Sequence, residues 1–242
     1  MPNQENPFLN GQYHTERAGE LIKFPGLETA NWQALRRGYR YTEMLMDQQE
    51  WEPLLGNDVR VLQMGIEGYR TADTFIKFIH SRNPQAVVTV ADFSPIPLKQ
   101  CIDNGIARLP NVNLVQADTT DLQFPDNSFN LIETDGLLQF LSPAEKRKAL
   151  AEWYRVLKPG GVVTTRDRFA GINHPREWDD LTSWKKALYK RLGADSYQTS
   201  LEVTRYLFTE QGFHTTFSKM YPDDRFGTRR VIYGIAARKP EV

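Results

Sequence analysis

Short apolar runs alternate along the chain with stretches in which apolar residues recur every three or four positions. The first run, 59–64, stops at Gly65, and a second run, 87–91, stops at Asp92. Between them, apolar residues at helical spacing over 71–80 predict an amphipathic helix. A strand–helix–strand unit of this kind requires a right-handed crossover between two parallel strands.

The same alternation continues to the end of the chain. Further strands are predicted at 112–116, 129–133, 162–166, 213–218 and 230–237, and further helices at 29–51, 95–104, 143–157 and 201–211. Lys158-Pro-Gly-Gly161 predicts a turn before the fifth strand. No helical pattern separates the last two strands, so they must pair antiparallel. The predicted fold is α/β, a doubly wound Rossmann-like sheet that is mostly parallel, with a terminal antiparallel hairpin and helices on both faces.

Two segments stand outside this alternation. Residues 1–56 predict an N-terminal arm and a cap helix, and residues 57–242 predict the main domain. Within that domain, an aromatic and leucine stripe at helical spacing predicts an insertion at about 167–200. Such a stripe is more often packing than a substrate-binding surface, and a lid over the sheet edge would combine the two.

Composition limits the partners. The 242 residues include 30 basic and 30 acidic ones, and this balance argues against nucleic acid or an anionic membrane as a general electrostatic partner. The single cysteine, Cys101, excludes an internal disulfide framework and a multi-cysteine metal site. Neither a leader pattern nor a membrane-spanning run is recognisable, so we expect a soluble, cytoplasmic protein.

Candidate chemistry gathers where the first two strands end. The turn from Gly65 to Gly68 brings backbone N–H groups and a helix N-terminus to the carboxyl edge of the sheet, where anionic ligand groups bind. Asp92 ends the second strand, where ribose hydroxyl groups could donate to its carboxylate. The first hypothesis is therefore a cofactor of nucleoside type.

Five segments carry a resemblance to a known family. They are 61–65, 90–92, 116–118, 124–132 and 152–161. The last two, Phe-Pro-Asp-Asn-Ser-Phe-Asn-Leu-Ile and Glu-Trp-Tyr-Arg-Val-Leu-Lys-Pro-Gly-Gly, are the most specific. On these motifs the chain resembles class I S-adenosylmethionine-dependent methyltransferases of the small-molecule, ubiquinone/menaquinone-biosynthesis-like kind. The resemblance covers 59–166 by motif and the remainder by element order.

The resemblance implies S-adenosylmethionine as cofactor and a role for each motif. The cofactor-binding residues that it implies are Gln63, Gly65, Glu67, Gly68, Asp92, Phe93, Asp118 and Thr119. The loop 63–68 would hold the methionine part, and Asp92 would accept from both ribose hydroxyls. Asp118 would accept from the adenine amino group, and residues 133–138 would lie under the sulfonium and face the substrate.

The glycine loop departs from the family pattern. The family has an acidic residue followed by glycine at three alternate positions, whereas here the acidic position is Gln63 and the later glycine positions are Glu67 and Tyr69. Losing the charge at Gln63 removes one electrostatic partner for a cationic ligand. Glu67 could restore that charge from a new place, or the loop could have drifted and bind nothing.

Methyl transfer from a sulfonium is an in-line displacement that depends mainly on placing the nucleophile. A base is needed only for a poorly acidic acceptor. The candidate catalytic residues are Asp135 and Glu133, at the end of the fourth strand, and His174, on the insertion. His174 could equally be a solvent-facing loop residue, and Glu133 could point away from the site. Asp135 and Asp167 lack a recognisable third ligand, so no metal is expected.

We therefore expect transfer of a methyl group from S-adenosylmethionine to a small, partly apolar molecule enclosed by the N-terminal arm and the insertion. The residues predicted to line that enclosure are Trp32, Tyr39, Phe169, Trp178 and Trp184. Two alternatives stay open: a non-catalytic methyltransferase-like scaffold or regulatory subunit, and a cofactor-binding enzyme that catalyses a different reaction. A homodimer or a partner subunit is also left open.

Other classes of enzyme fit less well. The fourth strand continues as Thr134-Asp-Gly-Leu137, without the Asn/Asp-Pro-Pro-aromatic motif of exocyclic-amine methylation on nucleic-acid bases. A nicotinamide dehydrogenase would need glycine where Arg70 stands.

Overall fold

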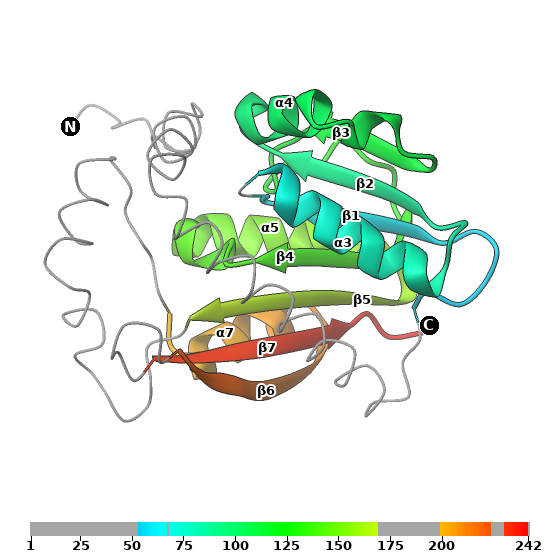
Figure 1. Ribbon diagram of the computed structural model, residues 1–242. Coiled ribbons are helices and arrows are strands. Elements are labelled where there is room, and N and C mark those ends of the chain that lie inside the picture. Colours follow the sequence, from blue (N-terminus) through cyan, green and yellow to red (C-terminus); the bar gives the residue numbers. More distant parts are fainter. Residues whose placement is uncertain (1–52, 67, 169–198, 224–229, 242) are drawn as a thin grey trace, which may run out of the picture.

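The computed structural model describes residues 53–66, 68–168, 199–223 and 230–241 (Figure 1). Within them a seven-stranded sheet has the order β3-β2-β1-β4-β5-β7-β6. The strands are β1 (Arg60–Met64), β2 (Val87–Asp92), β3 (Val112–Gln116), β4 (Phe129–Asp135), β5 (Leu157–Arg168), β6 (His214–Asp223) and β7 (Arg230–Arg238). The helices are α3 (Tyr69–Arg82), α4 (Pro95–Asp103), α5 (Pro143–Val156) and α7 (Leu201–Glu210), with short 3-10 helices η1 (Ile106–Arg108) and η2 (Leu138–Phe140).

The pairing of the strands confirms the predicted fold class. Strands β1 to β5 run parallel to one another, and β7 lies between β5 and β6, antiparallel to both. The strand order reverses at β1, which pairs with β2 on one side and with β4 on the other. In open α/β sheets, ligands bind outside the carboxyl ends of the strands at such a switch point.

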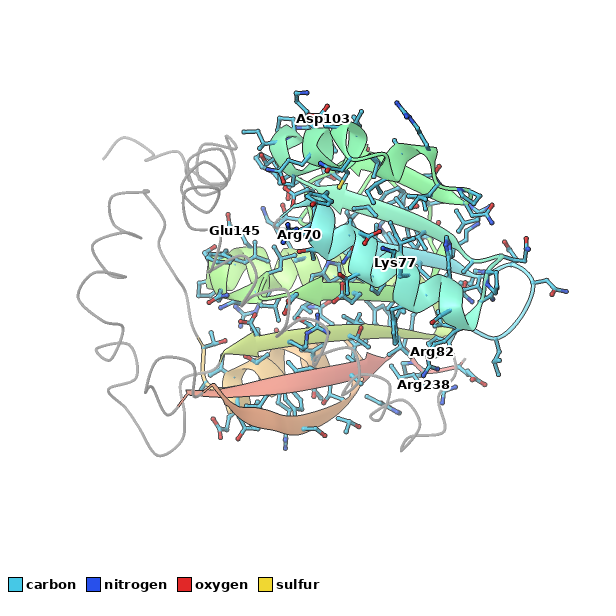
Figure 2. All side chains as sticks on the ribbon, viewed as in Figure 1. Arg70, Lys77, Arg82, Asp103, Glu145 and Arg238 are labelled. Atoms are coloured by element: carbon cyan, nitrogen blue, oxygen red, sulfur yellow. The ribbon has the colours of Figure 1, made fainter. Side chains whose placement is uncertain are left out.

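The core lies on both faces of the sheet. Adjacent residues of β1 point to opposite sides, so Val61 packs in the cluster with α3 and Leu62 packs in the cluster with α5. In Figure 1, α3 crosses in front of the sheet while α5 and α7 lie behind it. Figure 2 shows Arg70 and Lys77 on α3, where both are exposed. The opposite face of α3 is the buried, apolar one.

The predicted starts of α4, α5 and α7 are confirmed, and each of these helices ends one residue before the predicted end. Ser94 caps α4 by accepting a hydrogen bond from the Ile96 N–H, and Gly105, with φ of 81°, follows the end of that helix. Helix α5 begins with a complete capping box between Ser142 and Glu145. Each of these end signals lies within a few residues of the helix that it delimits.

The predicted boundary between α5 and the fifth strand is wrong. Helix α5 ends at Val156, and β5 already starts at Leu157, which was expected to be helical. The pairing with β4 jumps from Phe129–Leu157 to Leu131–Val162, so the Pro-Gly-Gly segment bulges out of the ladder. Backbone hydrogen bonds between Lys239 and the glycines at 160–161 keep this bulge within the sheet.

Several predicted features lie outside the described residues. They are Glu67, His174, the arm and helix over 1–52, and the part of the insertion at 169–198, with its aromatic residues. Asp167 and Arg168, expected to open the insertion, instead end β5. In the part of the chain that the structure describes, no helix is both long and apolar enough to cross a membrane.

Candidate functional site

The carboxyl ends of β1, β2 and β3 are joined by backbone hydrogen bonds. The Gly65 N–H donates to the Ala91 carbonyl oxygen at 3.1 Å, and the Ala117 N–H donates to the Asp92 carbonyl oxygen at 3.0 Å. The predicted glycine turn, ribose-binding residue and adenine loop are therefore neighbours at one edge of the sheet.

Two glycines shape the turn after β1. Gly65 has φ of 73°, and a Cβ there would lie 3.1 Å from Leu137 Cδ1. Gly68 precedes α3, and a Cβ there would lie 2.5 Å from Oε1 of Gln100, which belongs to α4. No side chain among the described residues caps the N-terminus of α3. Gly65 and Gly68 thus present bare backbone at the two ends of this turn.

Gly65→Ala should destabilise the protein by about 1–2 kcal/mol, because a left-handed conformation is costly for alanine and Leu137 must move. Gly105→Ala is the matched control: its φ is 81°, yet nothing lies within 4 Å of the added Cβ. Urea denaturation compares stability, and cofactor titration compares affinity. Both variants should lose stability, but only Gly65→Ala should lose affinity. Equal affinities in the two variants would contradict a binding role for the turn.

Asp92 is a buried carboxylate with an incomplete set of partners. Its side chain is 1% exposed, and its Oδ1 accepts a hydrogen bond from the Ser94 N–H at 2.8 Å. Its Oδ2 is buried without a hydrogen-bond partner among the described residues. Burial raises the pKa of Asp92 to about 7, although hydrogen bonds from the backbone of Ser94 and Ile66 oppose that rise. A ligand with two hydroxyl groups would supply the donors that this carboxylate lacks.

The loop after β3 is built differently around Asp118 and Thr119. Asp118 Oδ1 accepts from both the N–H and the hydroxyl of Thr120, which fixes the carboxylate at 2.8 Å from each donor. The Thr119 side chain is buried, and its hydroxyl oxygen accepts from Trp153 Nε1 at 2.8 Å. Thr119 therefore anchors the loop to α5, while Asp118 stays partly exposed at the edge.

The predicted catalytic carboxylates join a charged network at the end of β4. Glu133 is 1% exposed and accepts from Gln63 Nε2 at 3.2 Å and from Arg166 Nη2 at 2.8 Å. Arg166 Nε also donates to Asp135 Oδ1 at 3.3 Å. Burial raises the pKa of Glu133 to about 7 against the opposing charge of Arg166. Asp135, with its side chain 38% exposed, is the more accessible of the two acids.

Sequence reasoning missed Arg166 as a site residue. It stands near the end of the apolar run that forms β5 and is only 4% exposed. A charged residue in a strand that is buried on both faces needs a partner of opposite charge, and that requirement was the available signal. Asp167, noted as a metal candidate, instead accepts a hydrogen bond from the Gln139 N–H through Oδ2 at 3.2 Å.

Comparisons with known proteins agree with this geometry. Residues 68–161 match the family described as a methyltransferase domain. A ubiquinone/menaquinone biosynthesis C-methyltransferase of Shewanella piezotolerans is 35% identical over 147 residues, which cover 56% of this chain and 56% of that protein. The match thus spans little more than half the length of this curated relative.

Solved structures share the fold at low sequence identity. A chain from the complex that contains the Haloferax volcanii Trm112 methyltransferase activator superposes with a TM-score of 0.65 at 15% identity, covering 95% of this chain and 98% of that one. Haemonchus contortus phosphoethanolamine N-methyltransferase 2, in complex with S-adenosyl-L-methionine, gives 0.61 at 18% identity, covering 83% and 53%. Residues 68–161 of this chain therefore match a methyltransferase domain, and the sheet that contains them has the fold of these solved structures.

Proposed function

We propose that this protein transfers a methyl group from S-adenosylmethionine to a small, partly apolar acceptor. The observation that carries the proposal is the Asp92 carboxylate, which is buried at the carboxyl end of β2 with Oδ2 unpartnered among the described residues. A ribose diol has the two donors that such a carboxylate needs. The family match and the fold of the neighbours support the same cofactor class.

Each part of the edge has a distinct task in this proposal. The backbone from Gly65 to Gly68 lies against the methionine part, Asp92 accepts from the ribose hydroxyls beside Phe93, and Asp118 accepts from the adenine amino group. S-adenosylmethionine, when bound, supplies an activated methyl group. The chain's own contribution is to orient the cofactor and acceptor and to exclude water.

A base is needed only if the acceptor holds its proton tightly. Asp135 is the described carboxylate best suited to accept such a proton, because its side chain is 38% exposed whereas Glu133 is buried. Both oxygens of Glu133 already accept hydrogen bonds. His174 stays a proposed second base on the insertion.

The acceptor and the setting are also proposals. The name of the Shewanella relative supports a small-molecule acceptor methylated at carbon. We place the arm and cap over 1–56 and the insertion at about 167–200 around that acceptor. A cytoplasmic location fits the expectation from sequence. The activator in the Haloferax complex supports testing for a partner subunit alongside a homodimer.

Calorimetric titration of the purified protein with S-adenosylmethionine and S-adenosylhomocysteine tests the proposal. We expect dissociation constants in the micromolar range or below and, with a pool of phenolic and quinol acceptors, release of S-adenosylhomocysteine. NAD serves as the control nucleotide and should not bind. If millimolar cofactor produced neither heat nor a thermal shift, the protein would instead be a non-catalytic scaffold. Binding followed by a different product would point to another reaction on the same site.

A further inference from the structure

Gln63 and Glu133 face each other at the point where the strand order reverses. They are in direct register on the parallel strands β1 and β4, and both are 1% exposed. The hydrogen bond from Gln63 Nε2 to Glu133 Oε2 joins them. The end of β1 has Gln63 where the family has an acidic residue, and this Gln63 contacts a carboxylate on the neighbouring strand β4.

Two carboxylates and one guanidinium meet at this pair. Arg166 forms ion pairs with both Glu133 and Asp135, at 2.8 and 3.3 Å. With both carboxylates ionised, these three groups carry one net negative charge. A buried charge acts more strongly on a neighbouring ligand than an exposed one, since less water screens it. The raised pKa of Glu133 is consistent with a carboxylate that would gain from further positive charge nearby.

We propose that the single carboxylate of the Gln63–Glu133 pair determines the preference for cationic S-adenosylmethionine over neutral S-adenosylhomocysteine. In this chain that carboxylate stands on β4, and Gln63 and Arg166 are the positioning residues that hold it. Cofactor and product differ by the methyl group and by the positive charge on sulfur. A fixed negative charge at the switch point stabilises bound S-adenosylmethionine relative to bound S-adenosylhomocysteine. This inference rests on the proposed function.

Two variants isolate the charge. Glu133→Gln removes it but keeps an oxygen for Arg166, whereas the double variant Gln63→Glu with Glu133→Gln moves the carboxylate to β1 and retains the amide–carboxylate contact. Asp103→Asn is the matched control, because it makes the same change in charge at an exposed residue of α4 that pairs with Lys99 in the same helix. Circular dichroism and thermal melting check that each variant folds.

Calorimetry at pH 8 would measure the dissociation constants of both ligands. The quantity compared is the dissociation constant of S-adenosylhomocysteine divided by that of S-adenosylmethionine. We expect Glu133→Gln to lower this ratio roughly tenfold, because one nearby charge in a partly buried site is lost. In the double variant and in Asp103→Asn this ratio should stay within about threefold of that of the unmodified protein. An unchanged ratio in folded Glu133→Gln would overturn the inference.

If Glu133→Gln does not fold, the double variant tests the inference instead. A tenfold fall in its ratio of dissociation constants would overturn the inference, and an unchanged ratio would support it. Failure of the unmodified protein to bind either ligand would refute the proposed function itself. The two failures are therefore distinguishable.

Discussion

Asp92→Asn should abolish cofactor binding and, at the same time, stabilise the unliganded protein. The ionised carboxylate is buried, and its Oδ2 has no partner among the described residues, so it costs folding free energy until a ligand donates to it. Asparagine keeps an acceptor for the Ser94 N–H but lacks the charge that strengthens bonds from ribose hydroxyls. We expect at least a hundredfold loss of affinity for S-adenosylmethionine.

The gain in stability depends on pH in a defined direction. Burial raises the pKa of Asp92 from its ordinary value of 3.8, which holds in the unfolded chain, to about 7 in the folded protein. Between these values the folded state binds more protons than the unfolded one, so the contribution of Asp92 to stability falls as pH rises from about 4 to about 7. Above pH 7 the full cost is present, and Asp92→Asn should recover about 1–3 kcal/mol of it.

Urea denaturation at pH 5 and pH 8, without and with cofactor, measures both effects. Asp103→Asn is the control, because Asp103 is an exposed residue of α4 whose partner is Lys99 in the same helix. It should change stability by less than about 0.5 kcal/mol and leave affinity unaltered. Lower stability of unliganded Asp92→Asn at pH 8 would show that Asp92 contributes to folding by itself and is not held for a ligand.

The strand and helix pattern was predictable because it rests on short-range regularities. Apolar runs, the Ser142 capping box and the glycine after α4 each reveal their element within a few residues. The antiparallel hairpin followed from the missing helix between the last two strands. The Pro-Gly-Gly segment was misread as a turn because its place in β5 depends on Lys239, which is distant in sequence but adjacent in the fold.

The site was predictable only where strand ends bring residues together. Asp92 and the glycine turn could be placed by that rule, since parallel strands align their carboxyl ends. The contact between Gln63 and Glu133 could not, because it depends on the register between β1 and β4. The sequence also could not show that the two neighbours differ in role. The Thr119 hydroxyl accepts from Trp153 of α5, whereas the Asp118 carboxylate accepts from Thr120 within the loop.

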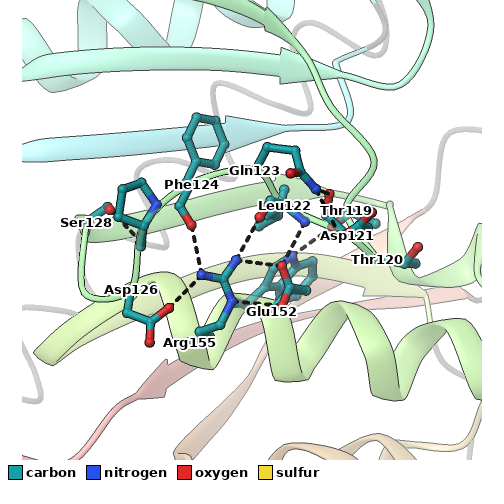
Figure 3. Close-up of polar contacts among 12 residues, drawn as sticks. Thr119, Thr120, Asp121, Leu122, Gln123, Phe124, Asp126, Ser128, Glu152 and Arg155 are labelled. Atoms are coloured by element: carbon teal, nitrogen blue, oxygen red, sulfur yellow. Dashed lines mark hydrogen bonds and ion pairs between the residues drawn. The ribbon is translucent and has the colours of Figure 1, made fainter.

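The two most specific motifs of the sequence form a network of hydrogen bonds and ion pairs around Arg155, the Arg155 network, rather than a binding surface. Figure 3 shows Arg155, from α5, donating to the loop between β3 and β4. It contacts the carbonyl oxygens of Leu122 and Phe124 at 2.7 and 2.8 Å, the Asp126 carboxylate at 2.7 Å and both oxygens of Glu152. Glu152 in turn accepts from the Leu122 N–H at 2.7 Å. The Arg155 network holds in place the loop that begins with Asp118.

Arg155→Met should therefore destabilise the protein by about 2–4 kcal/mol, because the two backbone carbonyls lose their donor and Glu152 loses its cation. Arg155→Lys should recover only part of this loss, since a single ammonium group cannot reach all the acceptors that the planar guanidinium spans. Guanidinium denaturation of both variants measures the difference.

The surface pair between Arg147 and Glu210 provides the control for that experiment. Its 3.0 Å contact joins α5 to α7, but half of the Arg147 side chain is exposed, so Arg147→Met should cost less than about 1 kcal/mol. Cofactor titration provides a second comparison between the Arg155 network and the surface pair, through the affinity of each variant for the cofactor. Only the Arg155 variants release the loop that carries Asp118, so only they should bind S-adenosylmethionine more weakly, by roughly tenfold if the adenine contact is lost. Equal stability of Arg155→Met and Arg147→Met would mean that packing of α5, and not this network, holds the loop in place.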